Sequence, residues 1–399
     1  MTGTHMLDET SQRLSALYAR FSPASKERFV ASLFMIANIQ PQEPCWCGSQ
    51  KLFMDCHRDR QRQRKITDSE TRSNLSRIMD ANEFCCATFD AANCGTFIKG
   101  AHTIQRGRVL QSMAKNGHVG TFYRNIHGFS NVGDIKNGVK RQASIFYGFC
   151  DYHDTELFKS FEVSEFTVSP ENCWASSYRA ICHEYYQKHA AKSAVAWQKD
   201  HSDRGYELYE QLLLQEQLAL LERDIRKGFD DINFIKQKFE ALKTNNQLHQ
   251  FTSYIVQLDQ PLDIAVCATV SPYYDINGVK IQNLGDPYIN FQHFFISTVT
   301  LQGNAAYLIA HLNEHSIIKD YLRDVFSRDN PFILDWLTKS IFAYSENTYF
   351  RLDWWSSLDP QRQQAIYGLA MDENYTRPFE YDDMVSASVR AKIQSIMVV

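Results

Sequence analysis

The chain has 399 residues, of which 44% are apolar and 22% are charged, and its formal net charge is −4. This length exceeds that of one ordinary compact domain, so we expect several units with cores of their own. The composition is typical of a soluble globular protein, and the sequence has no run of about eighteen apolar residues that could span a bilayer. It also lacks the pattern of a secretion signal, so we expect a cytoplasmic protein without membrane contact.

Residues 7–39 are expected to form two amphipathic helices separated at Ser22-Pro23. A cluster of metal-ligand types follows in the run Cys45-Trp-Cys47-Gly-Ser-Gln-Lys-Leu-Phe-Met-Asp-Cys56-His57. Ten cysteines in a chain of a reducing compartment are more typical of metal sites than of disulfides. Three thiolates and one imidazole can surround one ion tetrahedrally, which suits zinc and leaves no position open for a substrate. We predict a structural zinc site formed by Cys45, Cys47, Cys56 and His57.

This run resembles the SEC-C zinc motif, a short module found at the end of the bacterial translocation ATPase and attached to many otherwise unrelated proteins. The resemblance covers residues 45–57 and includes the Cys-Gly-Ser that starts at Cys47 and the closing Cys-His pair. It implies zinc binding and a contact surface for a protein partner, and it names no reaction. We expect residues 1–65 to form an N-terminal domain that ends in a basic linker or solvated face.

The next region, residues 66–168, is expected to form a second small domain in the order strand, long loop, strand and helix. Strands are expected at residues 96–104, 118–124 and 144–149, with an irregular loop over residues 125–138. A helix start is expected at Asp154, because the helix dipole stabilises acidic residues in the first turn. Residues 91–150 contain eight basic residues and one acidic residue, whereas residues 201–399 carry a net charge of −9. The basic segment is therefore expected to bind nucleic acid.

A second set of metal-ligand types flanks this strand and helix unit. Cys86 and Cys94 precede the first strand, and Cys150 and His153 lie where the helix is expected to begin. Two such pairs can close a second tetrahedral zinc site, and we predict these four residues as its ligands. Cys85 can take the place of Cys86, and without a metal the thiols would be ordinary core residues.

The layout resembles the treble-clef zinc fold of HNH nucleases. The resemblance implies that zinc supports the fold, that His102 at the end of the first strand activates water, and that Asp154 on the helix helps to hold Mg²⁺ or Mn²⁺. The chain departs from the family at Ala101, where an acidic residue or histidine is usual, and the expected asparagine between the strands cannot be assigned. Asp154 is equally suited to be a helix cap, and His102 to be a buried, hydrogen-bonded residue or a zinc ligand.

Three basic residues follow His102 closely enough to hold a nucleic-acid backbone in the same cleft, and they are Arg106, Arg108 and Lys115. An exposed helix face would also account for them. Two hypotheses of function result. The first is a zinc-binding protein with an HNH-like nuclease module acting on DNA or RNA. The second is a zinc-stabilised adaptor without catalysis, which binds nucleic acid or protein.

Residues 169–246 are expected to be helical, because apolar residues recur every three or four positions along one face. This helical seam can pair within the chain, as a hairpin, or with a second copy in a homo-oligomer. Residues 247–399 alternate between strand-like and helical patterns and are expected to form a C-terminal mixed domain. The predicted fold class is therefore α+β and multidomain, with small zinc modules, a helical hairpin region and a C-terminal α+β domain. The seam consists of Leu218, Leu221, Ile225, Phe229, Ile232, Ile235, Phe239 and Leu242.

Overall fold

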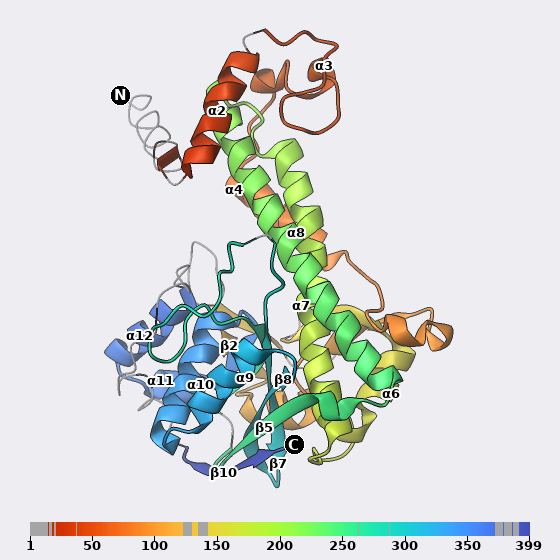
Figure 1. The fold of residues 1–399 in the computed structure, drawn as a ribbon, viewed down its shortest axis with the longest axis vertical. Coiled ribbons are helices and arrows are strands. Elements are labelled where there is room, and N and C mark those ends of the chain that lie inside the picture. The colour runs from red at the N-terminus through yellow and green to blue at the C-terminus, as the bar shows by residue number, and fades with distance from the viewer. Residues whose placement is uncertain are drawn as a thin grey trace. The chain divides into compact units, whose positions relative to one another are not determined.

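The computed structural model has the mixed α+β architecture that the sequence predicts, and Figure 1 shows its ribbon. It describes residues 15, 18–19, 21–36, 38–122, 130–134, 143–261, 263–286, 288–371, 378, 385 and 391–399. The chain divides into two compact units. Unit 1 comprises Met1–Asn82 and Gln187–Asp230, and unit 2 comprises Glu83–Tyr186 and Asp231–Val399. The domain boundaries expected from the sequence differ from these units. Residues 169–246, which are expected to form one helical region, are divided between unit 1 and unit 2.

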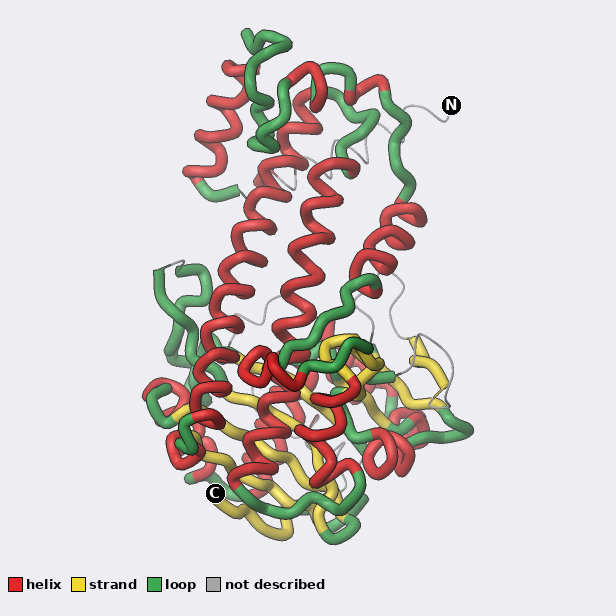
Figure 2. Tube along the Cα trace, turned by 90° about the vertical axis from the view of Figure 1, so that its right-hand side faces the viewer, coloured by secondary structure: helices red, strands yellow, loops and turns green. Residues whose placement is uncertain are grey.

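In its described part, unit 1 consists of helices joined by loops, as the tube in Figure 2 illustrates. The helix α4 begins with a capping box, in which Thr67 Oγ1 accepts from the Glu70 backbone and a Glu70 carboxylate oxygen accepts from the Thr67 backbone. Most of the first helix expected within residues 7–39 lies outside the described residues. The helices of this unit are α2 (Pro23–Ile36), α3 (Phe53–Cys56), the turn η1 (Arg60–Arg62), α4 (Asp68–Asp80) and parts of α7 (Pro170–His201) and α8 (Leu208–Thr244).

The helices α7 and α8 pair with each other inside each unit. In unit 1, Lys199 Nζ lies 2.7 Å from a Glu222 carboxylate oxygen. In unit 2, Trp174 Nε1 donates to the backbone oxygen of Phe239 at 2.9 Å. Because the part of the seam from Ile232 to Leu242 is buried in the core of unit 2, the intramolecular hairpin accounts for it.

Unit 2 is built on an antiparallel sheet with the strand order β10-β5-β8-β7-β6-β9-β2-β3. Alternate residues of a strand face opposite sides. Successive residues of β7 and β8 are buried, so both faces of the sheet are covered there. Phe294 packs toward Trp336 of α10 on one face, and Phe295 packs toward Phe239 of α8 on the other. The strands are β2 (His118–Thr121), β3 (Ser130–Asp134), β5 (Phe251–Leu258), β6 (Ile264–Val270), β7 (Phe294–Leu301), β8 (Asn304–Leu312), β9 (Thr348–Phe350) and β10 (Ile393–Val398).

The remaining elements of unit 2 cover this sheet or lead into it. The aromatic residues around Trp354 are core residues, because Trp354 is buried and packs against Phe350 and Phe342. The helices and turns are η2 (Thr88–Asn93), the π-helical turn η3 (Arg106–Leu110), α5 (Gln111–Met113), α6 (Asp151–Glu162), η4 (Leu248–Gln250), α9 (Ser316–Phe326), α10 (Asn330–Tyr344), α11 (Leu352–Ser357) and α12 (Pro360–Met371).

A separate two-stranded hairpin in unit 2 pairs β1 (Ile98–His102) with β4 (Ile145–Cys150) and continues directly into α6. Two of the predicted strands thus form the expected ββα unit. The third, over residues 118–124, is a strand of the large sheet instead, because β2 pairs with β3 and β9. The expectation of an irregular loop is wrong for residues 130–134, which form β3, and the rest of that loop lies outside the described residues.

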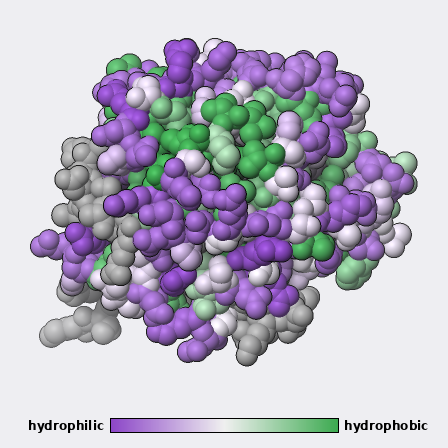
Figure 3. Space-filling model, turned by 90° about the horizontal axis from the view of Figure 1, so that it is seen from below, coloured by the Kyte–Doolittle hydropathy of each residue, from purple (hydrophilic) through white to green (hydrophobic). Residues whose placement is uncertain are grey.

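None of the helices in the described part of the chain combines the length and the apolar content that crossing a membrane requires. Figure 3 views the molecule from the lower end of Figure 1, and apolar side chains gather in one region of that face among polar ones. Large apolar residues of unit 2 with exposed side chains include Val163, Tyr288 and Val398.

Candidate metal centres

The first centre brings together all four ligands predicted near the N-terminus. One donor atom from each of Cys45, Cys47, Cys56 and His57 lies within 4.8 Å of the others. His57 Nδ1 is 3.2 Å from the Cys45 sulfur and 3.1 Å from the Cys56 sulfur, and the sulfurs of Cys47 and Cys56 are 3.6 Å apart. This set is suited to one structural zinc ion, with every tetrahedral position taken by the protein.

A tight turn places these ligands. The Cys45 backbone N–H donates to the Lys51 oxygen at 2.8 Å, and the Gly48 N–H donates to the Cys45 oxygen at 3.1 Å. Gly48 has φ +74°, a conformation that glycine adopts without steric cost. The short helix α3 then ends at Cys56, so that Cys56 and His57 face back toward the turn.

An outer shell surrounds His57 on the side away from the sulfurs. His57 Nε2 lies 2.8 Å from an Asp203 carboxylate oxygen, and both side chains are fully buried. Asp203 also accepts from Arg60 Nη1 at 2.7 Å and from Gln215 Nε2 at 2.8 Å. Burial opposes protonation of His57, but its hydrogen bonds to Asp203 and Cys47 outweigh burial and raise its pKa to about 10.

The second centre lies in unit 2 and consists of Cys85, Cys94, Cys150 and His153, whose donor atoms also lie within 4.8 Å of one another. His153 Nδ1 is 3.3 Å from the Cys85 sulfur and 3.1 Å from the Cys150 sulfur. Cys150 is the N-cap of α6, and its sulfur accepts from the His153 backbone N–H at 3.4 Å. The donor set again suits structural zinc, and Cys94 is its exposed member.

The prediction of Cys86 as a ligand is wrong, and its stated alternative Cys85 takes the position. Both residues lie in an extended segment, where Cys86 N–H donates to the Gly148 oxygen at 2.8 Å. Neighbouring side chains in an extended segment point to opposite sides. Cys85 therefore faces the metal site, whereas Cys86 is buried in the core with its sulfur 3.7 Å from the Cys182 backbone oxygen.

The other predicted site residues surround the end of β1. His102 pairs with Ile145 of β4 and is half-buried. Burial and the nearby charges of Arg106 and Arg179 lower the pKa of His102 to about 4, against an opposing effect of Asp154. The imidazole is thus neutral at physiological pH, although the Asp154 charge favours its protonated form.

Asp154 lies on the first turn of α6, and its carboxylate is 3.0 Å from Lys99 Nζ. The expectation that the helix starts at this residue is wrong by three positions, because α6 begins at Asp151. Asp154 is therefore not the N-cap, a role that falls to Cys150. The Asp154 side chain instead forms an ion pair with Lys99, which ties α6 to β1.

The three predicted phosphate-binding residues differ in their contacts. Arg106 and Arg108 lie on the turn η3, and Arg108 Nη2 donates to the Val163 oxygen at 3.5 Å. Lys115 forms an ion pair with Asp353. Among the other basic residues of this segment, Arg124, Lys136, Lys140 and Arg141 lie outside the described residues.

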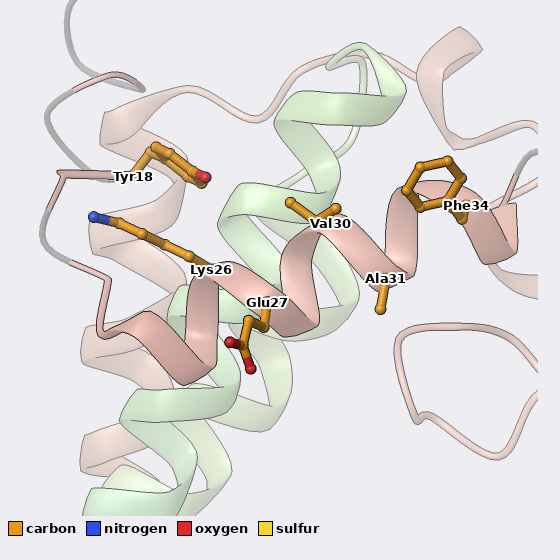
Figure 4. Close-up of a pocket in the computed structure, with 6 residues that line it drawn as sticks. All are labelled: Tyr18, Lys26, Glu27, Val30, Ala31 and Phe34. Carbon is orange, nitrogen blue, oxygen red and sulfur yellow. The ribbon is translucent and has the colours of Figure 1, made fainter.

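Unit 1 also carries a shallow groove along α2, lined by Tyr18, Lys26, Glu27, Val30, Ala31 and Phe34. Figure 4 shows five of these side chains along α2, from Lys26 to Phe34, and Tyr18 on the segment that precedes the helix. Its lining has one lysine and one glutamate and no thiol or imidazole. The groove therefore offers a mostly apolar surface.

No protein-family model matches the chain, and no curated protein and no solved structure matches it. The resemblance to SEC-C and HNH sequences therefore supports proposals only. Fold and site together define the class: an α+β protein of two units with two Cys3His clusters suited to structural zinc.

Proposed function

We propose that the chain is a metal-dependent nuclease acting on DNA or RNA, with β1, β4 and α6 as its zinc-stabilised catalytic module. The observation that carries the proposal is the position of His102. It ends the strand β1, whose residue Lys99 forms an ion pair with Asp154 of α6. The Cys3His cluster at the start of α6 gives this ββα unit a rigid base.

His102 acts as the general base in this proposal. A neutral imidazole accepts a proton from water, the resulting hydroxide attacks the phosphorus, and the bond from phosphorus to the leaving oxygen breaks. That oxygen keeps the electron pair and takes a proton from solvent. Asp154 would help to hold Mg²⁺ or Mn²⁺, which supplies charge stabilisation at the phosphate.

Basic residues near His102 support an anionic substrate. Lys99 and Arg106 are close enough to act on the pKa of His102, and Arg108 is an exposed residue of the same turn as Arg106. Phosphate contacts of this kind position a nucleic acid without reading its sequence. The proposal therefore concerns DNA and RNA alike.

A second candidate function is a zinc-stabilised adaptor that binds nucleic acid without cutting it. The observation that favours it is the Lys99 ammonium group, which lies 3.0 Å from the Asp154 carboxylate that a catalytic cation would need. In this alternative the pair has a structural role and ties β1 to α6.

The deciding experiment incubates the purified full chain with labelled DNA and RNA and with Mg²⁺ or Mn²⁺. We expect cleavage that falls at least about 100-fold in His102→Ala, the usual effect of losing a general base. His118→Ala is the matched control, because His118 is exposed on β2, and it should cleave like the wild type. Binding without cleavage by the wild type would favour the adaptor, and equal cleavage by His102→Ala would reject the assigned base.

A further inference from the structure

Both metal centres present their histidine in the same way. In each, Nδ1 faces the sulfurs and Nε2 faces a carboxylate that belongs to no ligand position: Asp203 for His57, and Asp90 for His153. A carboxylate that accepts the second ring N–H fixes the tautomer and orientation of a metal-bound histidine and strengthens it as a ligand. The two centres differ in how well this contact is made.

The outer shell of the first centre is complete. Asp203 is fully buried, and its two oxygens contact His57 at 2.8 Å, Arg60 at 2.7 Å and Gln215 at 2.8 Å. The Arg60 guanidinium, itself almost fully buried, compensates the charge of the carboxylate. A charge-assisted contact in a site without water is stronger than the same contact at the surface.

The outer shell of the second centre is weaker. His153 Nε2 lies 3.4 Å from the nearest Asp90 oxygen, and this buried nitrogen makes no hydrogen bond. About a third of the Asp90 side chain is exposed to solvent, and Cys94 is an exposed ligand. Water and competing chelators can therefore reach this centre more easily.

We infer that Asp203 is the outer-shell positioning residue of the first centre, and that it makes this centre the tighter of two zinc sites, so that zinc leaves the second centre first. Asp203 lies in the connection between α7 and α8, 146 residues from His57. Filling the first centre therefore also anchors that connection, through His57 and Arg60. The inference concerns metal binding only and stands whether or not the chain is a nuclease.

The test measures zinc affinity of each centre in the full chain by chelator competition. Cys94→Ser leaves only the first centre intact, and Cys47→Ser leaves only the second. We expect the Cys94→Ser protein to keep its zinc at higher chelator concentration than the Cys47→Ser protein. The reverse order, or equal affinity, would overturn the inference.

Asp203→Asn in the Cys94→Ser background tests the residue itself. Loss of an outer-shell carboxylate typically weakens metal affinity by about 10- to 100-fold, and we expect a loss of this size. Asp200→Asn is the matched control, because Asp200 lies in the same region and contacts Arg60 but not His57. It should leave the affinity unchanged.

Nitrogen NMR of His57 provides a readout that a merely structural role would not move. With zinc bound, the ring of the wild type should show a metal-bound Nδ1 and a protonated Nε2 held in a strong hydrogen bond. Asp203→Asn should shift the Nε2 signal and Asp200→Asn should not. If Asp203→Asn folds normally and both its Nε2 signal and its zinc affinity are unchanged, Asp203 is not the positioning residue of this centre.

Discussion

The two adjacent cysteines Cys85 and Cys86 show how one residue decides between ligand and core. Their spacing relative to Cys94 is almost the same, so the sequence alone left both open. Only the strand-like pairing of this segment with β4 determines which side chain faces the metal. The choice of Cys86 failed because local periodicity, and not ligand spacing, sets the direction of each side chain.

Zinc content should separate these two residues. Cys85→Ser removes a ligand of the second centre, so we expect metal analysis of the purified chain to fall from two zinc ions to one. Cys86→Ser changes a core thiol that contacts Cys182 and should leave two zinc ions bound. The opposite pattern would restore Cys86 as the ligand.

The titration of His102 is a second prediction at this scale. Burial and then Arg106 hold its pKa at about 4, and Arg106→Ala should move the midpoint measured by proton NMR upward. Because the folded state disfavours the proton, His102 contributes stability above its unfolded pKa of about 6.5, and this contribution is lost as pH falls toward 4. The free energy of unfolding of wild type should therefore fall more steeply than that of His102→Gln between these pH values. Parallel curves of the free energy of unfolding against pH for the two proteins would show that folding does not lower the pKa of His102.

A buried polar network joins the helices of unit 2 to the segment that carries Cys85. Glu240 of α8 accepts from Lys236 Nζ at 2.7 Å, from the Tyr178 hydroxyl at 2.6 Å and from the Thr88 backbone at 3.2 Å. The Lys236 and Glu240 side chains are both less than a tenth exposed. This network fixes the turn η2, which begins at Thr88, against α7 and α8.

Removing one partner of this ion pair should be costly. Glu240→Leu leaves the Lys236 charge buried and should lower the free energy of unfolding by about 3–5 kcal/mol. The double variant Lys236→Met with Glu240→Leu should recover much of that loss, because it buries no unpaired charge. Asp224→Ala, which breaks an exposed pair with Arg223, should cost less than about 1 kcal/mol. Chemical denaturation gives the free energy of unfolding of all three variants. Equal losses in Glu240→Leu and Asp224→Ala would show that the buried network stabilises the protein no more than an exposed ion pair.

Element prediction succeeded where the signal was local and failed where pairing was distant. The strands of the ββα unit could be predicted because each has its own local apolar pattern, although the exact helix start and the choice between Cys85 and Cys86 could not. The assignment of β2 to the large sheet could not, because its partner β9 lies more than two hundred residues away along the chain. Asp203 was missed for the same reason, since no local spacing links it to His57.

The whole molecule combines two units, each with one Cys3His cluster. The sequence predicted the first cluster in full and three of the four residues of the second, but not this division. Two of the boundaries between the units fall inside α7 and α8, where the composition does not change. The expectations of a protein partner at the SEC-C-like segment, of a second copy and of a cytoplasmic location stay predictions.

The two Cys3His centres are tested most directly by metal analysis of the full chain combined with zinc X-ray absorption. We predict two zinc ions per chain, an average environment of three sulfurs at about 2.3 Å and one nitrogen at about 2.0 Å, and one ion each in Cys47→Ser and Cys94→Ser. One zinc ion or none in the wild type, or an environment dominated by oxygen and nitrogen, would contradict the two Cys3His centres, one of which stabilises the proposed catalytic module.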